Sequence, residues 1–291
     1  MLYNYFSNKK LGVGIMARDC NNQLQKHIPK IEFLCSYFGF IKIVVIENDS
    51  VDGTKFTLTQ WQKRNKNVIV QSLDSVINNN ERTGSANSRI MRMCFFRNQY
   101  LKYFYDSNID FDYIIVVDID IDDFSVNTVL NSIIKAPDNW DALFANGRYY
   151  SKILGRYIKD RYYDNYAFVP FDSDEISLTY REIKLNNDYI NSHLKKIPYL
   201  RCKSAFGGIG IYKYNKIKNL TYQVIQNTRS SYYQTLCEHI SINQELKNCY
   251  ISQELLVLYE KIPIYKHFVN LLKRQTLILF IKEKIFHKII I

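Results

Sequence analysis

The sequence predicts an α/β fold with a largely parallel sheet that helices cover on both faces. Short runs of apolar, mostly β-branched residues recur along the first half of the chain, and stretches with helical apolar spacing separate them. Strands of such a sheet are buried on both faces, so they are apolar at nearly every position. One run, residues 113–117, is followed by a cluster of aspartates, at a place where α/β sheets bind ligands.

The first half contains the most regular elements. The predicted strands are residues 11–17, 41–47, 67–73 and 113–117. The predicted helices between them are residues 23–37, 54–64 and 88–106. Turn-forming residues around Asp52 and Gly53 separate the second strand from its helix, and a polar loop is expected at 75–88.

The second half is less regular. Residues 140–147 predict another strand, and residues 198–214 combine strand-like positions with three closely spaced glycines. Residues 150–197 are rich in tyrosine and charge, and their pattern assigns no clear element. The C-terminal stretch, residues 267–291, mixes apolar residues with lysines, which is typical of a basic, partly amphipathic helix.

Composition limits the class of protein. The chain is 47% hydrophobic and 23% charged, as in globular proteins, and its formal net charge of +11 favours anionic partners. It contains no recognised zinc-finger or aromatic RNA-binding motif, so we expect no nucleic-acid partner. The six cysteines form no CxxC pair, which indicates reduced thiols. Without a secretory signal or a spanning apolar run, the expectation is a cytoplasmic protein, either free or peripheral on the inner face of the cytoplasmic membrane.

The aspartates after the fourth predicted strand indicate a metal site. Asp118 and Asp120 stand where that strand should emerge at the ligand-binding edge. Carboxylates this close repel one another, and a divalent cation such as Mn²⁺ or Mg²⁺ removes the repulsion while sharing its other positions with phosphates. The alternative is a solvated acidic loop, which suits Asp122 and Asp123.

Two classes of enzyme place Asp-x-Asp after an apolar strand. In haloacid-dehalogenase-like phosphatases the first aspartate, here Asp118, is the nucleophile. That class usually has Thr or Val two places past the second aspartate, where this chain has Asp122, and carries its motif near the chain start. The second class is the nucleotide-sugar glycosyltransferases.

Three further segments resemble glycosyltransferases of the GT-A fold. GIMARDC (14–20) resembles their first strand and its loop, VVIENDSVDGT (44–54) their nucleoside-holding loop, and FFRNQYL (95–101) the helix before Asp-x-Asp. The resemblance is to capsule, lipopolysaccharide and mannosyl-transfer enzymes, and it covers roughly residues 10–250. It implies a GT-A-like nucleotide-binding sheet, an irregular acceptor half, a nucleotide-sugar donor and a saccharide or lipid-linked acceptor.

The resemblance also implies a nucleotide-binding group. Its members are Ala17, Arg18, Glu47, Asn48, Asp49, Ser50 and Arg97. The polar residues of the loop offer donors and acceptors for base and ribose, and the Arg97 guanidinium matches phosphate oxygens. The alternatives are turn-forming chemistry for the loop and a helix-surface position for Arg97. Arg89 and Arg92 are interpreted as surface charges.

The second half supplies the remaining candidates. Glu238 is the candidate base that takes the acceptor's proton, and His239 is a candidate third metal ligand or diphosphate contact; the alternative is a surface Glu-His pair. Phe206, Gly207 and Gly208 are expected beside the donor sugar, where glycine lets backbone approach a ligand, or else they form a tight turn. Asp164 lies in a tyrosine-rich segment, YYDNYAF (162–168), expected to face sugars.

Together these observations predict one domain and one activity. We expect a GT-A-like catalytic domain at 1–265, with a donor half at about 10–125 and an acceptor half at 126–265, followed by a basic helix at 266–291. The predicted activity is metal-dependent hexosyl transfer in surface polysaccharide or lipopolysaccharide synthesis, with peripheral membrane contact through the C-terminal helix. The alternatives are an Mg²⁺-dependent phosphatase using Asp118 and a non-enzymatic basic module that binds membrane or nucleic acid.

Overall fold

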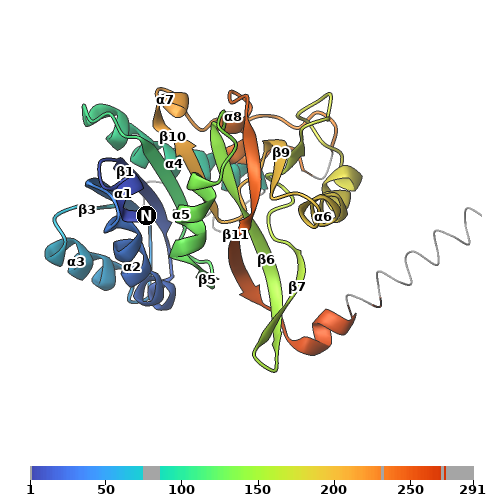
Figure 1. The fold of residues 1–291 in the computed structure, drawn as a ribbon, viewed down its shortest axis with the longest axis horizontal. Helices are drawn as coiled ribbons and strands as arrows, with labels where there is room; N and C mark the ends of the chain where they lie inside the picture. Colours follow the sequence, from blue (N-terminus) through green and yellow to red (C-terminus); the bar gives the residue numbers. More distant parts are fainter. Residues whose placement is uncertain (1, 75–85, 231–232, 270–271, 273–291) are drawn as a thin grey trace, which may run out of the picture.

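A computed structural model describes residues 2–74, 86–230, 233–269 and 272. In this part of the chain a single mixed sheet of 11 strands crosses the molecule, with helices on both of its faces (Figure 1). The α/β fold class is therefore confirmed. Its main path runs β3-β2-β1-β4-β10-β6-β11-β9-β8, and two short additions pair with it at β11 and β6.

The first half follows the predicted alternation of strands and helices. Its strands are β1 (Lys10–Ala17), β2 (Phe40–Glu47), β3 (Val68–Ser72) and β4 (Tyr113–Asp118). Its helices are α1 (Leu2–Phe6), α2 (Asn21–Cys35), α3 (Thr54–Arg64) and α4 (Ala86–Asp106). The four strands are parallel, so their carboxyl ends lie at one edge of the sheet. The short α1 was not predicted from the sequence.

The second half breaks the parallel pattern. Strand β10 (Ile209–Lys213) is antiparallel to both β4 and β6 (Ala142–Ile153), and β11 (Cys249–Lys261) is parallel to β6. Strand β9 (Tyr199–Ser204) is antiparallel to β11. The remaining strands are β5 (Asp123–Phe124), β7 (Arg156–Tyr162) and β8 (Val169–Pro170), and the remaining helices are α5 (Val126–Ile134), α6 (Tyr180–Leu194), α7 (Tyr214–Ile217) and α8 (Glu238–Asn243).

The stretch 150–197, to which the sequence pattern assigned no element, contains part of β6, β7, β8 and α6. Helix α6 begins at a capping box, in which the Thr179 hydroxyl accepts from the backbone N–H of Glu182 and the Glu182 carboxylate accepts in return. Its apolar positions are few, because four of its buried or half-buried side chains are asparagine or tyrosine. Sparse apolar spacing explains why periodicity alone did not find it.

Two hydrophobic cores lie on opposite faces of the sheet. Successive strand residues point to opposite faces, so Ile115 packs with α2, α3 and α5, whereas Ile114 and Val116 pack with α4, α6 and α8. Gly14 of β1 brings α4 close, because a Cβ there would lie 2.7 Å from Cδ2 of Tyr100. This close contact fixes the height of α4 above the sheet, and with it the position of the arginines that α4 carries.

The C-terminal region is described only in part. Residues 264–269 are helical after β11, and most of the predicted basic helix at 266–291 lies outside the described residues. Within the described chain, no helix has the length and apolar character to cross a membrane. All six cysteines are buried and unpaired.

Candidate active site

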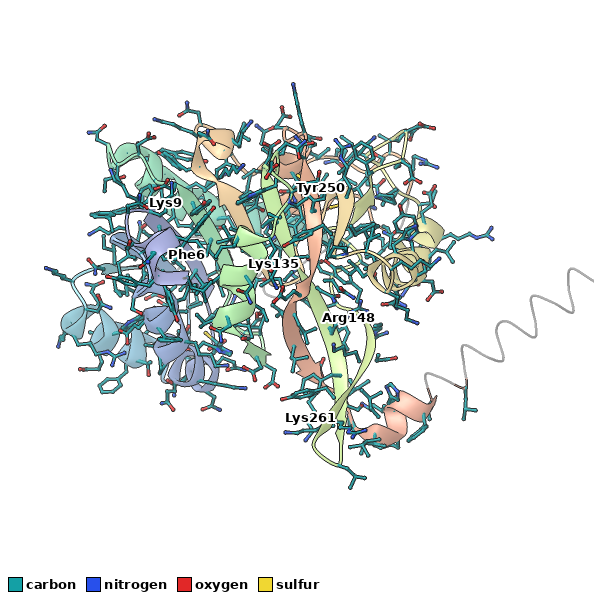
Figure 2. All side chains as sticks on the ribbon, viewed as in Figure 1. Phe6, Lys9, Lys135, Arg148, Tyr250 and Lys261 are labelled. Atoms are coloured by element: carbon teal, nitrogen blue, oxygen red, sulfur yellow. The ribbon has the colours of Figure 1, made fainter. Side chains whose placement is uncertain are left out.

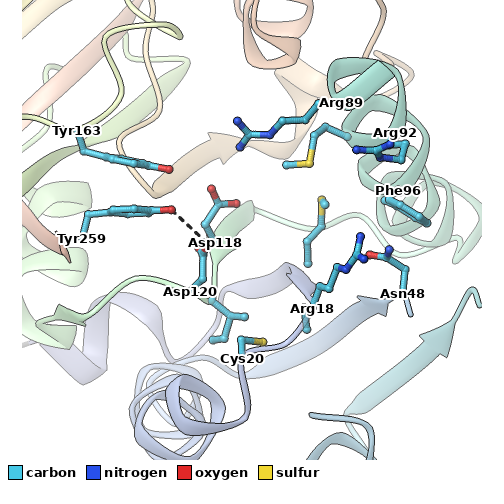
Figure 3. Close-up of a pocket in the computed structure, with 14 residues that line it drawn as sticks. Arg18, Cys20, Asn48, Arg89, Arg92, Phe96, Asp118, Asp120, Tyr163 and Tyr259 are labelled. Atoms are coloured by element: carbon cyan, nitrogen blue, oxygen red, sulfur yellow. Dashed lines mark hydrogen bonds between the residues drawn. The ribbon is translucent and has the colours of Figure 1, made fainter. Parts of the chain in front are cut away.

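A cavity of about 350 Å³ opens at the edge where β1 and β4 end (Figure 3). The ends of β1 and β2 supply Ala17, Arg18 and Asn48 to its lining, and the end of β4 and the loop after it supply Asp118 and Asp120. Helix α4 closes it on one side and two tyrosines from the second half close it on the other. The sheet edge predicted to bind a ligand therefore contains a cavity.

Asp118 is fixed by its backbone as well as by its side chain. Its N–H donates to the carbonyl oxygen of Gly208 at 2.9 Å. Gly208 has φ of +99°, and Gly207 before it has φ of +69°, which favours glycine at both positions. A Cβ on Gly207 would lie 2.2 Å from the backbone oxygen of Ala145, so this turn packs against the protein's own backbone. The glycines thus hold Asp118 at the cavity wall.

Arg97 joins two carboxylates behind the cavity. Its Nη2 donates to Oδ1 of Asp118 at 3.0 Å, and its Nε donates to Oε1 of Glu238, also at 3.0 Å. The side chain is 1% exposed, and its guanidinium lies over the rings of Phe206 and Tyr222. Arg97 does not line the cavity, so its position gives no support to the predicted phosphate contact. The structure instead makes it the residue that holds Asp118.

The neighbourhood of Arg97 carries excess negative charge. Burial raises the pKa of Asp118 to about 6; Arg97 lowers it in part, and repulsion from Asp120 and Glu238 raises it further. Asp164 shows the same effect, because burial followed by repulsion from Glu238 and Asp118 raises its pKa to about 7. Arg97 alone does not offset the repulsion at Asp118. A cation beside Asp118 and Asp120 would lower this repulsion further.

Asp120 is held by a pair of stacked tyrosines. The Tyr259 hydroxyl donates to Oδ2 of Asp120 at 3.1 Å, and the rings of Tyr163 and Tyr259 stack with centroids 3.4 Å apart at 14° (Figure 3). Both rings line the cavity. Tyr163 belongs to the segment 162–168 that the sequence analysis expected to face sugars, whereas Tyr259 was not selected. With 24 tyrosines in the chain, no sequence signal distinguishes Tyr259.

The loop after β2 divides into residues that reach the cavity and residues that build the loop. Asn48 lines the cavity together with Ala17 and Arg18. Glu47 is fully buried and accepts from the backbone of Ser50 at 2.9 Å and from the Ser72 hydroxyl at 2.7 Å. These contacts close the loop around Glu47.

The other two loop residues also make contacts within the protein. The Ser50 hydroxyl accepts from the backbone N–H of Asp19 at 3.1 Å. Asp49 has φ of +49°, and its N–H donates to Oδ1 of Asp74 at 3.0 Å. Neither residue lines the cavity. The predicted contacts of this loop with a nucleoside stay predictions.

Helix α4 presents two arginines to the cavity. Arg89 and Arg92 line it together with Phe96, at spacings of three and four residues that place all of them on one helix face. Arg89 is exposed and Arg92 half-buried, so they lie at the surface as interpreted, but the sequence analysis did not place them in the cavity. The spacing itself was the available signal, since it separates these two arginines from Arg97, which points into the core.

The second-half candidates lie behind the cavity wall. Glu238, at the start of α8, is 4% exposed, and His239 is 2% exposed and stacks on Phe206 with ring centroids 3.7 Å apart. Burial, followed by the charge of Arg97, lowers the pKa of His239. Phe206 is itself 1% exposed. The structure thus packs these side chains together, and their predicted contacts with metal, sugar and acceptor stay predictions.

Asp164 lies in a separate, neighbouring cavity of about 270 Å³. Tyr163 lines both cavities, so the two adjoin at this residue. The neighbouring cavity is also lined by Tyr149, Tyr166 and Tyr233. The Asp164 carboxylate accepts from the backbone N–H of Gly207 at 3.4 Å. Asp164 is therefore close to the aspartates of the first cavity without lining it.

Two residues on the cavity wall, Asp118 and Asp120, fit a divalent metal. Asp118 and Asp120 both line the cavity, and each uses one carboxylate oxygen in the hydrogen bonds described, to Arg97 and to Tyr259. Mg²⁺ and Mn²⁺ are commonly held by one or two carboxylates together with substrate phosphates. Across the described residues, no group of three or more His, Cys, Asp or Glu side chains is arranged to hold a metal, and the predicted role of His239 as a third ligand stays a prediction.

Comparison with known proteins gives similarity in structure only. No protein-family model matches the chain, and no curated protein matches it in sequence. Among solved structures, it is similar to the mannosyltransferase PcManGT from Pyrobaculum calidifontis in complex with GDP-Man and Mn²⁺. The TM-score is 0.50 at 11% identity, over 88% of this chain and 58% of that one.

Two other solved structures have lower scores. S. aureus TarS 1–349 in complex with UDP-GlcNAc has a TM-score of 0.47 at 14% identity, over 87% of this chain and 59% of that one. Glucosyl-3-phosphoglycerate synthase from Mycobacterium tuberculosis has a TM-score of 0.45 at 11% identity, over 94% of this chain and 82% of that one. This chain thus spans less than two thirds of the length of PcManGT and of TarS 1–349. Its mixed sheet and its similarity to PcManGT show that the chain has the GT-A fold of nucleotide-sugar glycosyltransferases.

Proposed function

We propose that this protein is a metal-dependent glycosyltransferase that moves a sugar from a nucleotide-sugar donor to a saccharide or glycolipid acceptor. The observation that carries the proposal is the pairing of Asp118 and Asp120 on the wall of one cavity at the carboxyl edge of a GT-A sheet. PcManGT, which has this fold, was solved with GDP-Man and Mn²⁺. The GT-A fold favours this proposal over the phosphatase alternative.

The cavity has groups that suit the nucleoside and the diphosphate of a nucleotide sugar. Arg18 and Asn48 lie at the strand ends, where base and ribose would be held, and Arg89 and Arg92 face the carboxylates from α4. Guanidinium groups bind phosphate oxygens well, so these two arginines suit the diphosphate. A bound Mn²⁺ or Mg²⁺ would neutralise the diphosphate as leaving group. Asp118 and Asp120 would hold that ion, with Arg97 and Tyr259 fixing the two carboxylates.

The acceptor must be deprotonated at its attacking hydroxyl if the reaction inverts the anomeric carbon. Glu238 was the sequence candidate for this base, and in the structure its carboxylate is paired with Arg97. Asp164 lies in the neighbouring tyrosine-lined cavity, and its raised pKa suits a group that exchanges protons near neutral pH. We therefore favour Asp164 as the base and assign Glu238 to the support of Arg97.

The proposal also includes the type of sugar, the pathway and the location that the sequence analysis predicted. We propose hexosyl transfer in the synthesis of a surface polysaccharide or lipopolysaccharide, at the cytoplasmic side of the cell. Peripheral contact with the membrane would be made by the basic segment 266–291. The net charge of +11 supports such contact with an anionic surface.

The proposal predicts metal-dependent cleavage of one donor class. UDP-, GDP-, CDP- and ADP-sugars would be incubated with the protein, and release of the nucleoside diphosphate, with water as acceptor, would be measured with Mn²⁺ and with chelator. One donor class is expected to be cleaved with Mn²⁺ only, and Asp120→Asn is expected to lower the rate by about 100-fold. Asp110→Asn serves as the control, because it makes the same substitution at a side chain that is 84% exposed. Equal rates for Asp120→Asn and wild type would contradict the proposal.

A further inference from the structure

A cavity of about 360 Å³ lies between β6, β7 and α6, and its lining is rich in positive charge. Strand β6 contributes Asn146 and Arg148, strand β7 contributes Lys159, and the end of α6 contributes Asn191 and Lys195. Figure 2 labels Arg148 in the region where β6 and β7 run side by side. None of these residues lines the cavity of the proposed active site.

Arg148 is a buried cation with neutral partners. It is 6% exposed, its Nε donates to Oδ1 of Asn146 at 2.7 Å, and its Nη1 donates to Oδ1 of Asn191. Its guanidinium also lies 5.8 Å from the centroid of the Tyr162 ring. These contacts orient the guanidinium at the cavity wall. They do not neutralise its charge.

The pKa values of the cavity's cations also indicate positive charge that is not neutralised. Burial lowers the pKa of Arg148 to about 10, so it stays charged at neutral pH. Burial and then the charge of Arg148 lower the pKa of Lys159. Within the described residues, no carboxylate offsets either shift. Lys195 adds a third cation to the same lining.

One carboxylate, that of Asp160, contributes to the lining as well. Its Oδ1 lies 4.0 Å from Nδ1 of His267, at the beginning of the C-terminal segment. It does not contribute to the pKa of Arg148 or of Lys159. The charge of the Arg148 guanidinium is therefore left without a counterion in the part of the chain that the structure describes.

A buried charge without a counterion destabilises the folded state, because the charged group loses its hydration and gains no paired charge in return. An anion in the cavity would remove this cost. The planar guanidinium matches the oxygens of a phosphoryl group bidentately, and two lysines add charge for a dianion. We propose that the cavity lined by Arg148, Lys159 and Lys195 binds a phosphoryl group. This inference does not rest on the proposed glycosyl transfer.

The test measures thermal stability with phosphate compounds at matched ionic strength. Inorganic phosphate and glycerol 3-phosphate would be compared with sodium chloride and sodium acetate, in protein free of metal and nucleotide. At about tenfold excess over Kd, phosphate is expected to raise the Tm of the wild type by about 2–5 °C. Arg148→Gln is expected to lose this shift. Lys152→Gln is the matched control, because Lys152 is an exposed cation on the same strand, β6, outside this cavity, and it should keep the shift.

Lys159→Gln is a second variant at the rim, and it is expected to lose most of the shift even if Arg148→Gln fails to fold. An equal Tm of the wild type in phosphate and chloride would overturn the proposal. So would equal stabilisation by acetate, or a full shift in a folded Arg148→Gln or Lys159→Gln protein.

Flotation with vesicles separates the two sources of such a group. Vesicles of phosphatidylcholine with phosphatidic acid would be compared with vesicles of phosphatidylcholine alone. Binding to the first kind that Arg148→Gln or Lys159→Gln abolishes assigns the cavity to a lipid headgroup. Stabilisation by glycerol 3-phosphate, with equal flotation of wild type and Lys159→Gln, assigns it to a soluble phosphorylated compound.

Discussion

Replacing Arg97 by methionine is expected to lower the free energy of unfolding by about 3–5 kcal/mol. Methionine fills much of the space, but it leaves Asp118 and Glu238 buried without the guanidinium to which both are hydrogen-bonded at 3.0 Å. Removing one partner of a buried ion pair costs more than the pair itself contributes, because the remaining charge is left uncompensated. Chemical denaturation of the metal-free protein measures the change.

A double-mutant cycle separates this electrostatic cost from lost packing. Glu238→Gln removes one of the two charges that Arg97 neutralises, so Arg97→Met should cost less in that background than in the wild type. A coupling of about 1–3 kcal/mol is expected. Strictly additive effects of Arg97→Met and Glu238→Gln would show that the two side chains do not interact, contrary to the structure.

Asp164→Asn is expected to stabilise the metal-free protein increasingly as the pH rises. The pKa of Asp164 is raised by burial from 3.8 to about 7, so the folded protein binds more protons than the unfolded chain between these values. Stability from this group is fully present at low pH and is lost as the pH rises through about 7. A neutral asparagine removes that dependence. Between pH 4 and pH 8 the advantage of Asp164→Asn should grow by about 2–4 kcal/mol.

The measurement is the Tm of wild type and variant across this range. The two curves should nearly coincide at pH 4 and separate by about 5–10 °C at pH 8. Asp110→Asn provides the control for removing a carboxylate, since Asp110 is exposed. The same Asp164→Asn protein should transfer sugar poorly, because the destabilising carboxylate is the proposed base. A pH-independent separation of the curves would contradict the raised pKa.

The elements of the first half of the chain could be predicted from the sequence because their signals are local. Each of its four strands contains a run of apolar residues, and Asp118 and Asp120 directly follow the run at 113–117. Parallel strands place their ends at one edge, so the cavity lining of Ala17, Arg18 and Asn48 follows from the order of elements.

The rest of the site depends on contacts between residues far apart in the chain. Arg97 and Glu238 are separated by 141 positions, and Asp120 and Tyr259 by 139. These pairs come into contact only because β10 lies antiparallel between β4 and β6. No local sequence pattern predicts that arrangement of strands. Arg148 poses the same difficulty, because an arginine flanked by glycine and tyrosine gives no sign of being buried.

The central claim is that Asp118 and Asp120 hold a divalent metal against a nucleoside diphosphate. The most direct measurement is a thermal-shift panel of UDP, GDP, CDP and ADP, each with Mn²⁺ and with chelator. We predict that one diphosphate at about 100-fold excess over Kd raises Tm by about 5–10 °C with Mn²⁺ only, and that Asp120→Asn abolishes the shift. Stabilisation that persists in chelator and in Asp120→Asn, or no stabilisation by any of the four, would contradict the claim.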